Sequence, residues 1–556
     1  MLSLLQESFA HGQKAGVVVR SEGAIFSTNF LKETIEVLLK PKREVRETVL
    51  GHLQRGGSPT AFERTLATRM GVKAIQLLEG VPPEPHMVGL SGNEIKPSLL
   101  TKSLEKIRES RFQEELSFNT KDAFHLSRRL ENPPKEKSRG VRIAILTDGD
   151  NVSGMNMATR AVARLAMNEG IEIMGIKGGF LGFAKGSESV FNLEWNMLEM
   201  KGILRRAGTL LGVSGNDFRA NEEDFLTIKK HAKNLKIDGI IAIGDNKTFQ
   251  HSHKLSQIVQ LPVVGIPAAF NCNLPGTNWV IGMDSTLNDL LRGIDRAAEA
   301  AHVQKKIFLI HLKGEYCRCL VMFAALGGGA EKMIIDDREP DSDDQEVLQN
   351  NIRKNIKELK SIIDMGKSFA TIVFFSKNTE KANDTIKFIK QTLDDYGIDL
   401  GTTVIPFETS YGGSVPTAFD RVLAKRFGEK AILTLQKKMD TRDYSFHIVG
   451  IRGKDIVSNS YQDMMDEFYH GCPRALTSEL QSCFDLMSQP NEVCIGMGGD
   501  VKWIDTRDGK QWKGEWKCKK CGQSQTFSFI PGKMLCLYCN DEMCHNYGYI
   551  RISRRL

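Results

Sequence analysis

One long stretch occurs twice in this chain, and that duplication restricts the fold more than any other feature of the sequence. GHLQRGGSPTAFERTLATRMGVKAIQLL at residues 51–78 returns as ETSYGGSVPTAFDRVLAKRFGEKAILTL at residues 408–435. The shared PTAF begins at Pro59 and again at Pro416, 357 positions further on. A long self-match at one spacing is typical of a duplicated domain, so we expect two copies of one folding unit.

Shorter repeats flank the long one in the same order. GVVVRSEG at residues 16–23 corresponds to ATIVFFSK at 370–377, and VGLSGN at 88–93 corresponds to VGIRGK at 449–454. Residues 140–369 have no counterpart before Gly16, so we expect the chain to begin inside its first copy. The predicted domains are the end of the first copy (1–95), a connector (96–139), the second copy (140–490) and a C-terminal domain of different character (491–556).

The second copy alternates short apolar runs with helical patterns. GVRIAILT, DGIIAIGD and LPVVGIPA are typical of buried parallel strands. This alternation predicts an α/β fold with open, mostly parallel sheets, whose sites form at the carboxyl ends of the strands. In the first copy, AGVVVRSEGA and TVLGH predict two further strands, and a helix is expected from Thr60.

Composition narrows the class of protein. The net charge of +7, from 75 basic and 68 acidic residues, is spread over 556 residues and is weak evidence for an acidic partner. No apolar run approaches the ~20 residues of a membrane span, so no membrane partner is expected. The N-terminus lacks the basic-then-apolar order of a signal peptide. Eleven cysteines, an odd number, are typical of a reducing compartment, which predicts a cytoplasmic location.

Several motifs along residues 1–465 resemble the phosphofructokinase family. GHLQRGGSPTAFER resembles the end of a catalytic half, TDGDNVSGMNMATRAVAR (147–164) the opening of the fold, and PAAFNCNLPGTN (267–278) the catalytic loop. The two fused copies resemble the eukaryotic-type enzyme. The resemblance implies ATP-dependent, Mg²⁺-assisted phosphorylation of fructose 6-phosphate in glycolysis, and assembly with like chains as a homo- or hetero-oligomer.

Four polar residues of the first copy are candidates for binding a sugar phosphate. Arg46 and Arg55 carry guanidinium forks that, with the His52 imidazole, can hold a phosphate. The Glu22 carboxylate can accept hydrogen bonds from sugar hydroxyls. The resemblance implies that Glu22, His52 and Arg55 serve their own half's pocket and that Arg46 reaches the partner half's pocket. An ordinary polar surface would carry the same residue types, so that interpretation stays open.

The catalytic loop of the second copy keeps its outline and changes its chemistry. Asn271 and Asn273 stand where the resemblance places two catalytic aspartates. Phosphoryl transfer needs a carboxylate to accept the sugar hydroxyl proton, and an amide cannot do so at neutral pH. We therefore expect no catalytic residue in this chain, and ATP with Mg²⁺ only if a further N-terminal part completes the first copy.

The nucleotide-binding turns of the second copy are altered as well. Lys247 and Thr248 replace the small Gly and Ser that would let a backbone approach phosphates. The turn at residues 147–156 holds Asp148 and Asp150, whose negative charge disfavours phosphate, so we interpret it as structural.

The most distinctive motif outside the repeat is a cysteine pattern near the C-terminus. Cys518 and Cys521 form one C-x2-C pair, Cys536 and Cys539 form a second, and 14 residues separate the two pairs. Four thiolates at this spacing can hold one tetrahedral Zn²⁺, which predicts a zinc ribbon with a structural metal. Lysines beside the first pair leave nucleic-acid contact open, although a simple cap on the second copy is the preferred interpretation.

Three hypotheses on function follow. The first is a degenerate phosphofructokinase homologue, inactive on its own, with a regulatory or scaffold role. The second is a fragment or subunit of an active 6-phosphofructokinase. The third is a structural subunit of a larger assembly that uses its zinc ribbon for contacts.

Overall fold

The structure is a computed structural model of the chain. It describes residues 2–10, 15–39, 44–79, 84–92, 94–108, 126, 129–130, 140–193, 201–215, 218–270, 274, 276–313, 318–336, 345–376, 379–408, 414–453, 455–470, 495–496, 499–504, 512–518, 524–529 and 549–550. The chain forms two compact units, and each takes segments from both copies of the repeat. The first unit comprises residues 1–60, 116–286 and 410–472; the second comprises 61–115, 287–409 and 473–556.

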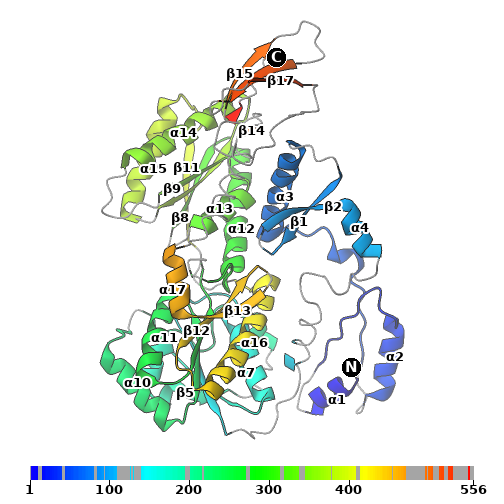
Figure 1. Ribbon diagram of the computed structural model, residues 1–556, viewed down its shortest axis with the longest axis vertical. Coiled ribbons are helices and arrows are strands. Elements are labelled where there is room, and N and C mark those ends of the chain that lie inside the picture. The colour runs from blue at the N-terminus through cyan, green and yellow to red at the C-terminus, as the bar shows by residue number, and fades with distance from the viewer. Residues whose placement is uncertain are drawn as a thin grey trace. The chain divides into compact units, whose positions relative to one another are not determined.

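The first unit is built on a seven-stranded sheet with the order β13-β12-β7-β6-β3-β4-β5 (Figure 1). Its strands are β3 (Arg142–Thr147), β4 (Glu172–Ile176), β5 (Val190–Asn192), β6 (Gly239–Gly244), β7 (Val263–Pro267), β12 (Phe446–Arg452) and β13 (Asp455–Ser460). The five inner strands are parallel, and β5 and β13 pair antiparallel at the edges. β6 and β7 are buried along their whole length, as continuous apolar runs predict for parallel strands.

Helices pack on this sheet, with α7 and α16 on one side and α10 and α11 on the other (Figure 1). The helices of the unit are α1 (Leu2–Ala10), α2 (Thr28–Leu38), α7 (Met155–Asn168), α8 (Gly179–Lys185), α10 (Glu222–Asn234), α11 (Asn246–Val259), α16 (Ala418–Thr441) and α17 (Tyr461–His470), with short 3₁₀ turns η1 (Gly51–Gln54), η2 (Ser187–Ser189) and η3 (Lys201–Leu204). α10 begins at a capping residue, Asn221, whose side chain accepts from the Asp224 N–H at 2.7 Å.

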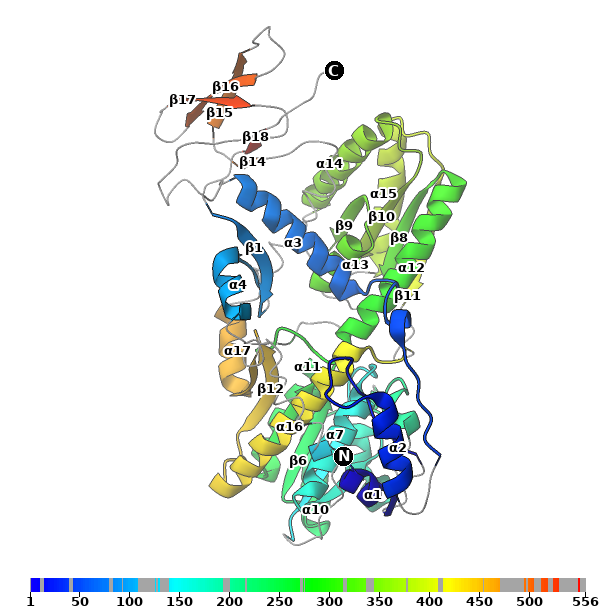
Figure 2. The same ribbon diagram turned by 90° about the vertical axis from the view of Figure 1, so that its right-hand side faces the viewer.

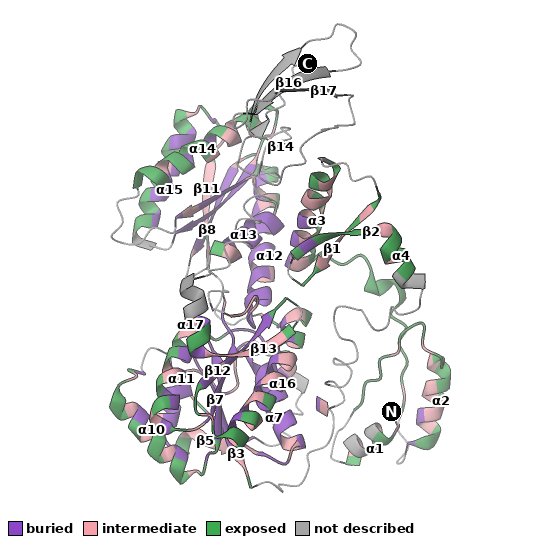
Figure 3. Cartoon of the chain, viewed as in Figure 1, coloured by how far each residue is buried: buried purple, intermediate pink, exposed green. Residues whose placement is uncertain are grey.

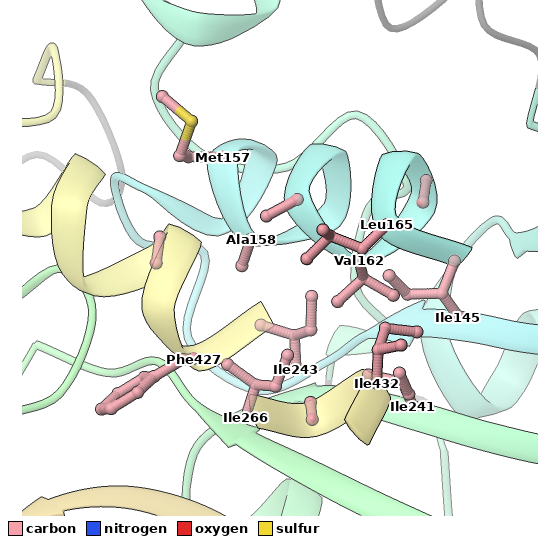
Figure 4. Packing of buried hydrophobic residues seen from close by; sticks show 14 of the residues in the cluster. Ile145, Met157, Ala158, Val162, Leu165, Ile241, Ile243, Ile266, Phe427 and Ile432 are labelled. Atoms are coloured by element: carbon pink, nitrogen blue, oxygen red, sulfur yellow. The ribbon is translucent and has the colours of Figure 1, made fainter. Parts of the chain in front are cut away.

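The core of the first unit lies where α7 and α16 meet the sheet. Figure 4 shows side chains from both helices packed over strand residues: Ala158, Val162 and Leu165 from α7, Phe427 and Ile432 from α16, and Ile145, Ile241, Ile243 and Ile266 from the strands. All of these are at most 3% exposed. The second copy of the long repeat, which contains α16, is therefore fixed on its own sheet.

The second unit contains a four-stranded parallel sheet with the order β11-β8-β10-β9 (Figure 2). Its strands are β8 (Ile307–Lys313), β9 (Lys332–Asp336), β10 (Ala370–Ser376) and β11 (Thr402–Glu408). Its helices are α3 (Ala61–Glu79), α4 (Leu100–Arg108), α13 (Arg318–Gly327), α14 (Gln345–Asp364) and α15 (Thr379–Asp395), together with α12 (Met283–Gln304) from Leu287 onward. β8 pairs with β10 on one side and with β11 on the other, so it lies between these two strands.

The two strands predicted in the first copy are not formed. Among the described residues, 15–20 and 44–50 belong to no strand, Leu50 has αR dihedral angles, and the expected second strand runs into η1. The prediction was wrong because a strand needs a neighbour. The corresponding β10 and β11 both pair with β8, and no strand among the described residues takes that place in the first copy. The predicted helix after Thr60 is confirmed as α3.

The end of each copy is a hairpin, and the two hairpins differ in their surroundings. β1 (His86–Ser91) and β2 (Glu94–Leu99) form a two-stranded antiparallel sheet by themselves. The corresponding β12 and β13 belong to the seven-stranded sheet, because β12 also pairs with β7. Accordingly β12 is largely buried, whereas β1 and β2 are mostly half-buried or exposed (Figure 3).

The C-terminal region contributes two small antiparallel sheets. β15 (Gly499–Ile504), β16 (Trp512–Cys518) and β17 (Ser524–Phe529) form one, and β14 (Ile495–Gly496) pairs with β18 (Tyr549–Ile550) in the other. Over the described parts of the chain, every helix is too short or too polar to span a bilayer.

Candidate functional site

Glu22, the predicted acceptor for sugar hydroxyls, lies in a turn that follows residues 15–20. Arg20 organises this turn, because its guanidinium donates to the backbone oxygens of Phe26 (2.6 Å), Ala24 (3.0 Å) and Glu22 (3.2 Å). The Glu22 side chain itself is exposed. The turn therefore has a defined backbone that leaves the carboxylate accessible.

The three predicted phosphate-binding residues, Arg46, His52 and Arg55, are exposed. Arg46 pairs with Glu44 at 2.8 Å, with the two side chains 84% and 72% exposed. Such a surface pair contributes only ~0–1 kcal/mol, so the guanidinium can exchange partners. His52 lies in η1, and its backbone oxygen accepts from the Arg55 N–H at 2.9 Å. In the part of the chain that the structure describes, no hydrogen bond or ion pair joins the side chains of Glu22, Arg46, His52 and Arg55.

The carboxyl end of β3 in the second copy is organised by the buried Asp148. Its carboxylate accepts from the N–H of Ser214 (2.8 Å), the hydroxyl of Ser214 (2.8 Å), the N–H of Gly149 (3.0 Å) and the N–H of Phe180 (3.3 Å). Both oxygens are used to join β3 to α8 and to the segment around residue 214. The structural interpretation of this turn is therefore confirmed for Asp148.

At the carboxyl end of β6 a second carboxylate closes the start of α11. Asp245 caps the helix: its Oδ1 accepts from the backbone N–H and the hydroxyl of Thr248, each at 2.9 Å, while Thr248 Oγ1 accepts from the Asp245 N–H at 3.3 Å. The carboxylate also lies against Gly149, where a Cβ would stand 2.3–2.5 Å from its atoms. Gly149 has φ +72°, so glycine suits both the conformation and the space.

In this arrangement a carboxylate of the chain itself occupies the N-terminus of α11, where an anion could otherwise bind. A helix N-terminus attracts phosphate through its free N–H groups and its positive dipole end. Here the Asp245 carboxylate takes that place, and the Asp148 carboxylate accepts a hydrogen bond from the Gly149 N–H. Residues of this turn do not fit a nucleotide triphosphate with its magnesium ion. Asn271 and Asn273, the altered catalytic pair, lie outside the described residues.

A buried pair of carboxyl groups that the sequence reasoning missed joins α12 to α16. Asp420 accepts from the Ser285 hydroxyl (2.6 Å), the Ser285 N–H (2.8 Å) and the Gly282 N–H (3.0 Å). Asp284 accepts from the Thr417 hydroxyl at 2.6 Å. Burial, together with the nearby charge of Asp284, raises the pKa of Asp420 to about 7. Burial also raises the pKa of Asp284, against its bond from Thr417.

Only part of the predicted zinc site is described. Cys518 is the last residue of β16, while Cys521, Cys536 and Cys539 lie outside the described residues. Within the described ranges, no cluster of three or more His, Cys, Asp or Glu side chains could hold a metal ion. β17, which lies between the two cysteine pairs, is paired antiparallel with β16.

Comparison with known proteins shows the family to which this chain belongs. A family model described as Phosphofructokinase matches residues 1–78 and 142–435. The ATP-dependent 6-phosphofructokinase, muscle type, of Homo sapiens is 29% identical over 514 residues, covering 84% of this chain and 63% of that protein. Its relative from Macaca fascicularis is 30% identical over 459 residues, covering 77% of this chain and 56% of that protein. The chain thus spans less than two thirds of the length of these relatives.

Solved structures show the same fold. The crystal structure of Pichia pastoris phosphofructokinase in the T-state aligns with a TM-score of 0.73 at 23% identity, over 87% of this chain and 59% of that one. Phosphofructokinase from Saccharomyces cerevisiae aligns with a TM-score of 0.69 at 22% identity, over 83% of this chain and 64% of that one. The predicted α/β architecture with parallel sheets is confirmed.

Proposed function

Since this chain belongs to the phosphofructokinase family, we propose that it is a homologue that does not phosphorylate sugar by itself and that acts as a regulatory or scaffold member of the family. The family reaction is ATP-dependent phosphorylation of fructose 6-phosphate to fructose 1,6-bisphosphate, a step of glycolysis. In this proposal the chain keeps residues for recognising a sugar phosphate and has lost the means to bind the phosphoryl donor.

The observation that carries the proposal is the closed start of α11. The Asp245 carboxylate caps the helix and fills the space against Gly149, where a phosphate would need to approach the backbone. Two unit charges of one sign at 4 Å repel each other by about 4 kcal/mol near a protein surface. A triphosphate brought to this turn would meet that repulsion and would also have to displace the helix cap.

The first copy supports a remaining role in sugar-phosphate recognition. Arg46, His52 and Arg55 are exposed cationic or ionisable groups within ten residues of one another, and Glu22 is exposed on a turn with a fixed backbone. Guanidinium groups bind phosphate through paired N–H donors, and a carboxylate accepts from hydroxyl groups. A ligand that combines both chemistries, such as fructose 6-phosphate, is the candidate for this surface.

Two assays test this function. The purified chain, given ATP, Mg²⁺ and fructose 6-phosphate in a coupled assay, should show no turnover, and a rate on the order of 1–100 per second would overturn the proposal. Calorimetric titration with fructose 6-phosphate should give binding that the double variant His52→Ala, Arg55→Ala weakens at least tenfold. Arg219→Ala, which removes an exposed arginine elsewhere in the first unit, is the matched control and should bind as the parent does.

The C-terminal region adds a proposed structural zinc ribbon. Cys518, Cys521, Cys536 and Cys539 would hold the ion as thiolates, and with four protein ligands no position remains for a reacting water. A cap on the family fold is the proposed role. Nucleic-acid contact is the weaker alternative, and salt-sensitive binding of an oligonucleotide that disappears in Cys518→Ser would favour it.

A second candidate function is a subunit of an active 6-phosphofructokinase in the cytoplasm, assembled with like chains. Residues 15–20 and 44–50 of the first copy favour it, because among the described residues they belong to no sheet, whereas their repeat counterparts β10 and β11 do. Turnover that appears only when a second phosphofructokinase polypeptide is added would support this function over the regulatory one.

A further inference from the structure

The strands β15, β16 and β17 of the C-terminal region form an antiparallel sheet in which β16 is the middle strand (Figure 2). Their sequences hold three of the five tryptophans of the chain. In such a sheet, residues that are Cα partners lie on the same face, and successive residues of one strand lie on opposite faces. The register of the three strands therefore determines which residues share a face.

The two faces of this sheet differ sharply in the residues that belong to them. By the register, all five aromatic residues of the three strands lie on one face: Trp503, Trp512, Trp516, Phe527 and Phe529. The charged residues of the same strands lie on the other face: Asp500, Lys502, Lys513, Glu515 and Lys517. We call the first of these the aromatic face.

The kind of apolar residue on the aromatic face is typical of a binding surface. Cores are built chiefly from Leu, Ile, Val, Phe and Ala, and tryptophan is used in them where its N–H finds a partner. Tryptophan is enriched where proteins bind other molecules. Within the three strands, Val501 is the one aliphatic residue of this face.

A glycine occupies the middle of the aromatic face. Gly514 has Trp503 and Phe527 as its Cα partners in the two neighbouring strands. Trp512 and Trp516 lie two positions before and after it in β16. Four aromatic residues thus surround one position that has no side chain, an arrangement suited to a ligand with flat rings.

The charge of the region indicates which ligand with flat rings it would bind. Residues 491–556 hold 11 basic and 7 acidic residues, a net charge of +4, whereas the preceding 490 residues hold 64 basic and 61 acidic residues, a net charge of +3. The excess is greatest at residues 510–533, which contain six lysines and one acidic residue, Glu515. Aromatic residues also bind cations, but this charge disfavours a cationic ligand. A polyanion that carries flat rings agrees with both features.

We propose that the aromatic face of the β15–β16–β17 sheet is a stacking surface for single-stranded nucleic acid. Bases stack on aromatic residues with little dependence on sequence, and lysines attract the phosphate backbone. This binding is separable from contact through the lysines beside Cys518, because it does not need the cysteine pairs. It also rests on neither the proposed regulatory function nor a role of the region as a cap.

Fluorescence anisotropy of end-labelled oligouridylate and oligodeoxythymidylate, each about 12 nucleotides long, tests binding to the full chain. We expect a Kd on the order of micromolar at about 50 mM salt, and a several-fold higher Kd at about 200 mM salt. Binding of only one of the two supports the proposal and identifies the sugar that the face accepts. A duplex of the same length should bind at least tenfold more weakly, because its bases are already stacked on one another.

Neighbouring residues of β17 provide a matched pair of variants. Phe527 lies on the aromatic face and Thr526 lies on the opposite one. Phe527→Ala should weaken binding at least tenfold, whereas Thr526→Ala should bind as the parent does. Trp516→Ala should likewise weaken binding at least tenfold, and Trp516→Phe, which keeps an aromatic ring, should recover most of the affinity.

Gly514→Val separates loss of the binding surface from loss of the fold. Valine has a higher strand propensity than glycine, so hydrogen exchange of the amides in residues 512–518 should be no faster than in the parent. The added side chain at the middle of the aromatic face should nevertheless weaken binding at least tenfold.

Several results would overturn the proposal. Absence of binding by both oligonucleotides would show that the aromatic face is not available to them. Equally tight binding of the duplex would show that phosphate contacts alone explain the affinity, as would binding that Phe527→Ala, Trp516→Ala and Gly514→Val leave unchanged. Tighter binding of a proline-rich peptide than of either oligonucleotide would assign the face to a different ligand. None of these readouts involves ATP or fructose 6-phosphate, so the proposed function is tested separately.

Discussion

The buried Asp420 carboxyl group makes the stability of the first unit depend on pH. Its three hydrogen-bond donors come from Gly282 and Ser285 at the start of α12, so the group ties that end to α16. Burial and the neighbouring Asp284 raise its pKa in the folded chain to about 7, whereas its ordinary value is 3.8. The folded state therefore keeps a proton that the unfolded state has already released.

The sign and size of the effect follow from proton linkage. Between pH 3.8 and about 7 the folded state binds more protons, so stability falls as the pH rises through this window and levels off above it. A difference from 3.8 to about 7, at ~1.4 kcal/mol per pKa unit, corresponds to about 4 kcal/mol for this one group.

Hydrogen exchange of α16 amides as a function of urea, from pH 4.5 to 8, measures this contribution. Asp420→Asn removes the titrating group, so the parent-minus-variant difference in unfolding free energy should fall by about 3 kcal/mol between pH 4.5 and 8. Taking the difference cancels other groups that titrate in the same range. His251, His253 and His447 have pKa values lowered by burial, so they destabilise the fold as the pH falls below 6.5.

Asp284→Asn supplies the companion measurement. It removes the charge that raises the pKa of Asp420, so the pH dependence should become smaller without disappearing. A parent-minus-variant difference for Asp420→Asn that is flat across the window, or one that moves in the opposite direction, would refute the reasoning.

Three further predictions concern the structural contacts. Asp148→Ala removes the acceptor of three backbone N–H groups in a buried site and should destabilise the first unit by about 3 kcal/mol or more, measured by exchange in α8; a loss below about 1 kcal/mol would contradict the role of this residue. Arg64→Lys breaks a two-pronged pair with Asp295, at 2.7 and 2.8 Å, and should cost about 1 kcal/mol in the local stability of α3; unchanged exchange would show that the fork is not needed. Elemental analysis should find about one zinc per chain, lost in Cys518→Ser, and a metal-free parent protein would end the ribbon hypothesis.

Secondary structure could be predicted from the sequence where the local pattern of one segment determines it. β3, β6 and β7 are continuous apolar runs, and each became a buried parallel strand as expected. α3 and α16 share a helical pattern and are both helices. Yet residues 15–20 have the same kind of β-branched run and form no strand, because pairing depends on a neighbour that the local pattern does not contain.

The roles of the buried aspartates were harder to predict than the helices and strands. In the sequence, Asp148 and Asp245 are ordinary turn residues. Their structural roles depend on contacts with residues distant in sequence, Ser214 for Asp148 and Gly149 for Asp245. Asp420 directly follows the repeated PTAF motif, three residues after the helix cap Thr417, and only its burial next to Asp284 makes it notable. A glutamate, Glu63, occupies the matching position of the first copy, and that difference between copies was the one available signal.

The β1–β2 hairpin of the second unit has one edge strand that discourages the addition of a further strand and one edge strand that does not. β2 carries Pro97 and the ion-paired Lys96 and Glu94, which discourage another strand from adding to it. β1 (His86–Ser91) has neither proline nor an Asp, Glu, Lys or Arg residue, and its counterpart β12 uses the equivalent side to join β7. Concentrated solutions of this chain should consequently become turbid through β1, and Val88→Lys should keep them clear.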